Sequence, residues 1–166
     1  AVRKMKRPFI TLEQVKKITK EYPTPFHIYD EKGIRENARR LKKAFSWNKG
    51  FKEYFAIKAT PNPYILKILH EEGCGMDCSS LTELMLSEAL GITGEEIMFS
   101  SNATPAQEFV KARELDAYIN LDDFTHIDFL DKVAGLPKTI SCRYNPGGIF
   151  KVSNGIMDNP GDAKYG

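Results

Sequence analysis

The sequence predicts an α/β fold in which parallel strands alternate with helices, and two observations favour a barrel. Short apolar runs alternate with segments of helical periodicity along the 166 residues, at about 20 residues per unit from the second run onward. This rhythm is typical of parallel strands joined by right-handed crossovers. A doubly wound nucleotide-binding sheet would need a glycine-rich turn after its first strand, and the sequence has none there. A (β/α)8 barrel is therefore favoured.

Six runs are predicted to be strands. They span residues 25–29, 53–58, 74–78, 96–101, 117–121 and 139–144. The segments between them repeat apolar residues every three or four positions and carry helix signals. Predicted helix starts are Asn62-Pro63, Ser80 with Glu83 as a capping box, Thr104-Pro105, and Asp122 or Asp123; predicted stops are the glycines at 73, 91 and 135.

Three strands end in a charged side chain on their small or polar face. Alternation along a strand places Lys58 on the face of Tyr54 and Ala56, and it places Asp77 and Arg143 at corresponding tips. The carboxyl ends of barrel strands carry active sites, and Lys58 and Asp77 are expected on neighbouring strands about 5 Å apart. Each residue alone has a simpler interpretation: a solvated lysine, a helix cap or an ordinary ion-pair partner. Their coincidence on one predicted edge favours a site.

Composition excludes several other classes of protein. Residues 1–60 hold 16 Lys/Arg against 6 Asp/Glu, but these charges fall between regularly spaced apolar positions, as on a solvated helix face, so nucleic-acid binding is not expected. No apolar stretch is long enough to cross a membrane. Cys74, Cys78 and Cys142 cannot all pair, which favours a reducing cytoplasm. The spacing of Cys74 and Cys78, without partner ligands, indicates packing and no metal site.

Four segments together resemble the fold-type III pyridoxal-phosphate decarboxylases, which act on diaminopimelate, ornithine or arginine and are more distantly related to alanine racemase. The segments are "YFAIKATPNPYIL", "GMDCSSLTEL", "CRYNPGG" and "KYG". The resemblance implies a PLP-binding (β/α)8 TIM barrel of the alanine-racemase-like type, truncated here to about five or six strands. It implies a helical lead-in over residues 1–24 and the N-terminal part of the barrel over residues 25–166, with the rest of the barrel and a C-terminal β domain absent.

The resemblance also implies roles for individual residues. Lys58 matches the lysine that holds pyridoxal 5'-phosphate as a Schiff base, and Asp77, Glu83 and Arg143 match polar residues around it. Lys58, Asp77 and Arg143 are the expected catalytic group. The implied reaction is decarboxylation of a basic amino acid, foremost meso-2,6-diaminopimelate to L-lysine, by a homodimer.

Three alternatives stay open: an ornithine or arginine decarboxylase of polyamine synthesis, a non-catalytic PLP-binding relative, and a barrel with unrelated chemistry. The family's ring-stacking histidine and phosphate-binding loop would follow "AKYG", so the chain alone is expected to be inactive.

Overall fold

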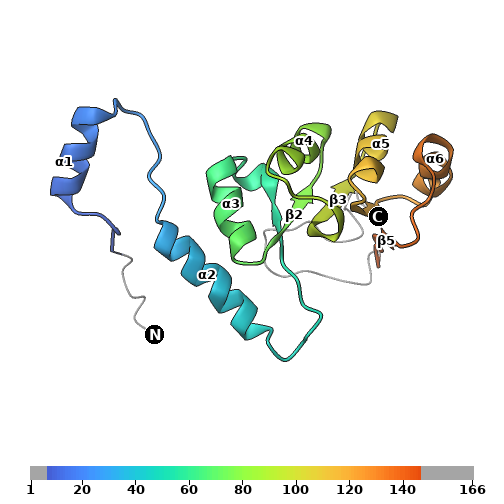
Figure 1. The fold of residues 1–166 in the computed structure, drawn as a ribbon, viewed down its shortest axis with the longest axis horizontal. Coiled ribbons are helices and arrows are strands. Elements are labelled where there is room, and N and C mark those ends of the chain that lie inside the picture. Colours follow the sequence, from blue (N-terminus) through green and yellow to red (C-terminus); the bar gives the residue numbers. More distant parts are fainter. Residues whose placement is uncertain (1–6, 147–166) are drawn as a thin grey trace.

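The computed structural model describes residues 7–146 as five parallel strands connected by helices (Figure 1). The strands are β1 (Tyr54–Ala56), β2 (Gly75–Cys78), β3 (Ile97–Ser101), β4 (Tyr118–Leu121) and β5 (Ile140–Cys142). Their order in the sheet is their order in the chain, and every neighbouring pair is parallel. A doubly wound sheet would reverse its strand order at one point, whereas a barrel wall does not. The predicted barrel type is confirmed.

Six helices and two short 3₁₀ turns accompany the strands within the described residues. They are α1 (Leu12–Glu21), α2 (Glu31–Ala44), η1 (Ile57–Ala59), α3 (Pro63–Glu71), α4 (Leu81–Ala89), η2 (Gly94–Glu96), α5 (Ala106–Glu114) and α6 (Thr125–Ala134). Helices α3 to α6 each connect one strand to the next and follow one another along one side of the sheet (Figure 1).

Local signals fix where these helices begin and end. The side-chain oxygen of Asn62 accepts hydrogen bonds from the backbone N–H groups of Tyr64 and Ile65, and Pro63 takes the first helical position of α3. Glycines 73, 91 and 135 follow the helices with φ of 90°, 75° and 73°, a conformation that favours glycine. The predicted starts and stops at these positions are confirmed.

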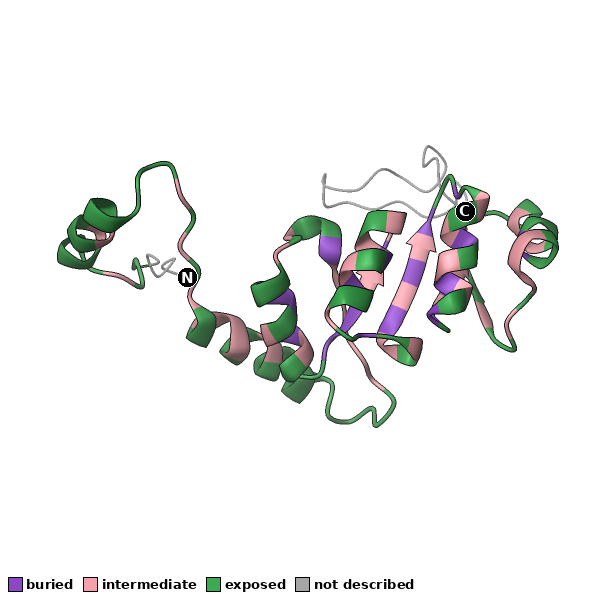
Figure 2. Ribbon diagram, turned by 45° about the horizontal axis from the view of Figure 1, so that its top comes forward, coloured by how far each residue is buried: buried purple, intermediate pink, exposed green. Residues whose placement is uncertain are grey.

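The hydrophobic core lies between the helices and one face of the sheet. Along β3, buried residues alternate with half-buried ones from Ile97 to Ser101, which Figure 2 shows as coloured bands along the strand. Met76, Phe99 and Ile119 are fully buried on the helix-facing side of their strands, while Asp77, Ser100 and Asn120 lie half-buried on the opposite, inner face. The sheet therefore has an apolar outer face and a polar inner face.

The predicted strand at residues 25–29 is not formed. Its burial does alternate, since Phe26 and Ile28 are half-buried while His27 and Tyr29 are exposed, but the backbone pairs with no described strand. Alternation requires only an extended chain with one sheltered side, whereas a strand also requires a partner with a free edge. The prediction of a strand here was wrong.

The predicted strand at residues 53–58 ends early. β1 stops at Ala56, and residues Ile57–Ala59 form a 3₁₀ turn in which the N–H of Thr60 donates to the carbonyl of Ile57 at 3.0 Å. The chain has to turn here because α3 begins at Pro63, only a few residues on. Lys58 consequently lies beyond the strand, and the prediction that it shares a strand face with Tyr54 and Ala56 was wrong.

Candidate active site at the carboxyl edge of the sheet

Lys58 stands at the carboxyl edge, one turn beyond β1. Its neighbour Ile57 is fully buried and anchors the turn in the core, while the Lys58 side chain is exposed. Among residues 7–146, no carboxylate forms an ion pair or hydrogen bond with its amine. A lysine amine attacks an aldehyde only in its unprotonated form, and a paired carboxylate would favour the ammonium form. The local structure therefore leaves this amine accessible to a ligand.

Asp77 is held in place by a residue that the sequence analysis missed. Asp77 lies on β2 opposite Ala56 of β1 and Met98 of β3. The hydroxyl of Ser100 on β3 donates to Asp77 Oδ1 at 2.5 Å. The alternation of β3 was the available signal, because it places Ser100 on the same inner face as Asp77. The acid beside the lysine-bearing strand thus has a fixed hydrogen-bond partner.

Glu83 shapes the loop that follows β2. Its carboxylate accepts a hydrogen bond from the backbone N–H of Ser79 at 2.7 Å and another from the Ser79 hydroxyl at 3.2 Å. The Ser80 hydroxyl in turn accepts from the N–H of Glu83 at 3.4 Å. These contacts cap α4, as predicted, although the carboxylate reaches Ser79 and not Ser80. A contact of Glu83 with the cofactor stays a prediction.

Arg143 lies across the edge from Asp77. It follows β5, and its Nη1 donates to Asp122 Oδ1 at 2.6 Å. Two strands, β3 and β4, separate the strand of Asp77 from β5, so the strand axes lie about 14 Å apart at about 4.8 Å per step. The structure places Lys58 in the turn after β1, the strand next to that of Asp77, whereas Arg143 follows β5, three strands away from β2.

Asp122 and Asp123 have different partners. Asp122 is buried, with 9% of its side chain exposed, and it accepts the hydrogen bond of Arg143. Asp123 is exposed and accepts from the N–H and the hydroxyl of Thr125, at the start of α6. A cavity of about 200 Å³ lies beside both acids and Arg143. The N-cap position of α6 is Phe124, so the cap predicted at Asp122 or Asp123 is wrong, although Asp123 accepts a hydrogen bond from the first residue of the helix.

Cys78, at the end of β2, and Cys74, just before its start, are buried packing groups. Burial raises the pKa of the Cys78 thiol to about 12, and burial also raises the pKa of Cys74. Both thiols therefore stay protonated at neutral pH. Within residues 7–146, no three His, Cys, Asp or Glu side chains come close enough together to hold a metal ion.

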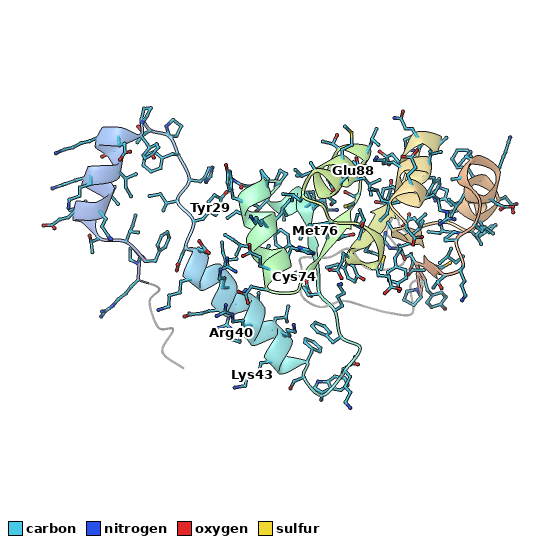
Figure 3. The ribbon with its side chains drawn as sticks, in the orientation of Figure 1. Tyr29, Arg40, Lys43, Cys74, Met76 and Glu88 are labelled. Carbon is cyan, nitrogen blue, oxygen red and sulfur yellow. The ribbon has the colours of Figure 1, made fainter. Side chains whose placement is uncertain are left out.

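A second hollow lies away from this edge. It has a volume of about 320 Å³ and lies between α2, α3 and β1. Tyr29, which precedes α2 in the chain, and Cys74, which follows α3, are two of its lining residues and are labelled in Figure 3. None of the predicted site residues lines it. The candidate site is therefore the carboxyl edge and not this hollow.

Comparison with known proteins places the chain in a family. Residues 31–166 match the model of the pyridoxal-dependent decarboxylase, pyridoxal binding domain. The chain belongs to this family. Among curated relatives, Protein TabA of Pseudomonas amygdali pv. tabaci is 42% identical over 149 residues, which are 90% of this chain and 34% of the relative. The diaminopimelate decarboxylase of Methanothermobacter thermautotrophicus is 35% identical over 127 residues, 76% of this chain and 30% of the enzyme.

Solved structures agree with this assignment. The diaminopimelate decarboxylase from Helicobacter pylori complexed with L-lysine superposes with a TM-score of 0.71 at 30% identity, covering 80% of this chain and 34% of that one. SrLDC in complex with PLP and cadaverine gives a TM-score of 0.69 at 25% identity, covering 78% and 33%. The chain thus spans about a third of the length of the relatives that it matches. No helix within residues 7–146 combines the length and apolarity needed to traverse a bilayer.

Pyridoxal phosphate, the cofactor that this family binds, fits the residues of the carboxyl edge. An aldehyde needs an accessible amine, which Lys58 supplies without a competing carboxylate among the described residues. A polar ring needs polar neighbours that are already oriented, and the inner face offers Asp77 with its hydrogen bond from Ser100. The edge therefore offers an amine and an oriented acid, two of the kinds of group that this cofactor needs.

Proposed function

We propose that this chain forms the lysine-bearing part of a PLP-dependent carboxy-lyase that acts on meso-2,6-diaminopimelate and releases L-lysine. The observation that carries the proposal is the exposed side chain of Lys58 at the carboxyl edge, in the turn that follows β1, the strand next to that of Asp77, in a chain of the pyridoxal-dependent decarboxylase family. The family supports the reaction class, and the names of several relatives favour this substrate.

The chain's own residues would divide the work between holding and orienting. Lys58 would hold the cofactor through its Nζ, which also exchanges a proton with the amine of the incoming amino acid. Asp77 sets the charge beside that amine from the neighbouring strand. Arg143, paired with Asp122, places a positive charge at the far side of the edge, where it can orient a carboxylate. When bound, pyridoxal phosphate supplies an electron sink for the electron pair left by the departing carboxylate.

Diaminopimelate is favoured by the curated relatives. Diaminopimelate decarboxylases of Methanothermobacter thermautotrophicus and Thermoplasma acidophilum are 35% and 33% identical to this chain. A second candidate is ornithine or arginine, because the ornithine decarboxylase from Entamoeba histolytica also superposes, with a TM-score of 0.65 at 28% identity. A third is cofactor binding without turnover.

A parallel substrate assay tests the proposal. The complete gene product that contains these residues would be incubated with pyridoxal phosphate and meso-diaminopimelate, L-ornithine or L-arginine, while CO2 and the amine product are measured. We expect L-lysine from diaminopimelate, with kcat/KM for the other substrates at least about a hundredfold lower. Putrescine or agmatine as the main product would support the second candidate. A bound cofactor without CO2 from any substrate would support the third.

A pair of lysine variants serves as the control for this assay. Lys58→Ala should lose CO2 release and the visible absorbance of the bound cofactor. Lys67→Ala removes another exposed lysine, on α3, and should lose neither. Equal activity of the two variants would contradict the role given to Lys58.

We also propose that the gene product is a cytoplasmic homodimer. The cysteines at 74, 78 and 142 are all free thiols, which suits a reducing compartment. The homodimer is the assembly implied by the resemblance of the sequence to this family. Sedimentation velocity of the complete gene product tests the dimer, and a single monomeric species would contradict it.

A further inference from the structure

We propose that Ser100 is a positioning residue for this reaction: its hydroxyl holds the carboxylate of Asp77 in one orientation, leaning toward the carboxyl edge at which Lys58 lies. The inference rests on the proposed function, because it assigns Ser100 a role through Asp77 in the site that binds the cofactor. Ser100 would touch neither cofactor nor substrate, and it would act only by fixing its neighbour.

The strand register shows in which direction Ser100 draws the carboxylate. The register partner of Asp77 on β3 is Met98, so Ser100 lies two residues further toward the carboxyl edge. Ser100 Oγ nevertheless reaches Asp77 Oδ1 at 2.5 Å. Two residues of strand advance by about 6.6 Å, so the Asp77 side chain has to lean toward the edge to accept this bond.

Lys58 lies beyond the carboxyl end of β1, on the other side of Asp77 from Ser100. The register partner of Asp77 on β1 is Ala56, the last residue of that strand, and Lys58 follows Ala56 by two residues in the 3₁₀ turn η1. A carboxylate that leans toward the edge therefore leans toward the end of the sheet at which Lys58 lies. Without the bond from Ser100, the Asp77 side chain could adopt other rotamers within the half-buried inner face.

One oxygen of the carboxylate stays available for this purpose. Ser100 engages Oδ1, and within residues 7–146 Oδ2 receives no hydrogen bond from a protein group. A fixed carboxylate with one free oxygen is suited to orient a neighbouring amine. Preorganised polar groups of this kind lower the reorganisation needed during the reaction.

The sheet contains a matched serine that serves as an internal control. Ser100, Asn120 and Ser141 are register partners in one row across β3, β4 and β5. Ser141 Oγ donates to Asn120 Oδ1 at 2.8 Å, so it makes the same kind of bond on the same face. Its partner is a neutral amide on β4, remote from Lys58. Ser141 is exposed whereas Ser100 is half-buried, so removing the Ser141 hydroxyl should perturb the sheet no more than removing that of Ser100, and it should leave Asp77 unaffected.

The test compares S100A, S100T and S141A in the complete gene product. Two quantities are measured: the rate at which pyridoxal phosphate binds, followed by visible absorbance, and kcat and KM for decarboxylation. We expect S100A to lose about tenfold in the binding rate and in kcat, as removal of a hydrogen bond to a charged group predicts, with KM within about twofold. S100T restores the hydroxyl and should recover to within about threefold of the native values. S141A should stay within about twofold throughout.

Two results would overturn the inference: S100A behaving like S141A, or S100T being as impaired as S100A. The melting temperature of each variant is measured alongside, and the rates are taken below all transitions, so a loss of fold is separated from a loss of positioning. If the native protein binds the cofactor but decarboxylates none of the basic amino acids, the proposed function fails, while the cofactor-binding rates still decide the role of Ser100.

Discussion

Arg39 donates from both Nε and Nη2 to the carboxylate of Glu72, each at 2.7 Å, and thereby ties α2 to the end of α3. Arg35 adds a third bond to the same carboxylate at 3.0 Å. Only 9% of the Glu72 side chain is exposed. Hydrogen bonds first from Arg39 and then from Arg35 lower the pKa of Glu72 from 4.5 to about 2.

This relationship predicts a pH dependence for the docking of α2. A carboxyl whose pKa is lower in the folded state stabilises the fold above its unfolded pKa and stops doing so as the pH falls through the folded value. The protection factors of the α2 amides, in which the intrinsic pH dependence of exchange is divided out, should therefore be constant from pH 8 to about 5. They should fall between about pH 4.5 and 2.

Two neighbouring glutamates provide the control for that experiment. Glu72→Gln should weaken the protection of α2 at neutral pH and remove most of its acid dependence. Glu71→Gln should have the smaller effect, because Glu71 is half-exposed and hydrogen-bonds to Arg35 alone among the described residues. Equal protection of α2 at pH 3 and pH 7 in the native protein would contradict the role of Glu72.

Phe109 is predicted to be a main contributor to the core between α5 and the sheet. Its side chain is 1% exposed, and its ring meets those of Phe99 and Phe129 edge to face at 6.2 and 5.9 Å. Phe109→Ala should lower the free energy of unfolding by about 3–5 kcal/mol, measured by denaturant titration. Val110→Ala, at the next position of α5 and 37% exposed, should cost less than about 1 kcal/mol. Similar losses for the two variants would disprove the assigned orientation of α5.

Gly75 is predicted to be required for a close approach between backbones. A Cβ at this position would lie 2.8 Å from the backbone oxygen of Glu96 and 2.6 Å from the ring of Tyr54. The Glu96 backbone has little freedom to move, because β3 begins at the next residue. Gly75→Ala should therefore lower the free energy of unfolding by about 1–3 kcal/mol.

Gly50→Ala is the matched control for Gly75→Ala. A Cβ at Gly50 would find only Asn48 Oδ1, at 3.6 Å, which is an ordinary contact. This variant should be nearly neutral. A Gly75→Ala protein as stable as the Gly50→Ala protein would show that the sheet can accommodate the extra methyl group.

Local features of the fold could be predicted from the sequence, because they depend on residues close to one another in the chain. The cap at Asn62 and the helix end at Gly135 are of this kind. The strand at 25–29 failed because pairing depends on a distant partner. Lys58 was placed at the correct edge but on the wrong element, since alternation cannot show where a strand gives way to a turn. The bond from Ser100 to Asp77 depends on the register between two strands, which the sequence does not specify.

The central claim, that Lys58 carries the cofactor, is tested most directly by borohydride reduction followed by peptide mapping. The complete gene product would be loaded with pyridoxal phosphate, reduced so that the bond to lysine becomes permanent, digested, and examined by mass spectrometry. The predicted result is one modified peptide, with the pyridoxyl group on Lys58. A modified peptide carrying Lys52 or Lys67 in its place, or no modified lysine at all, would contradict the claim.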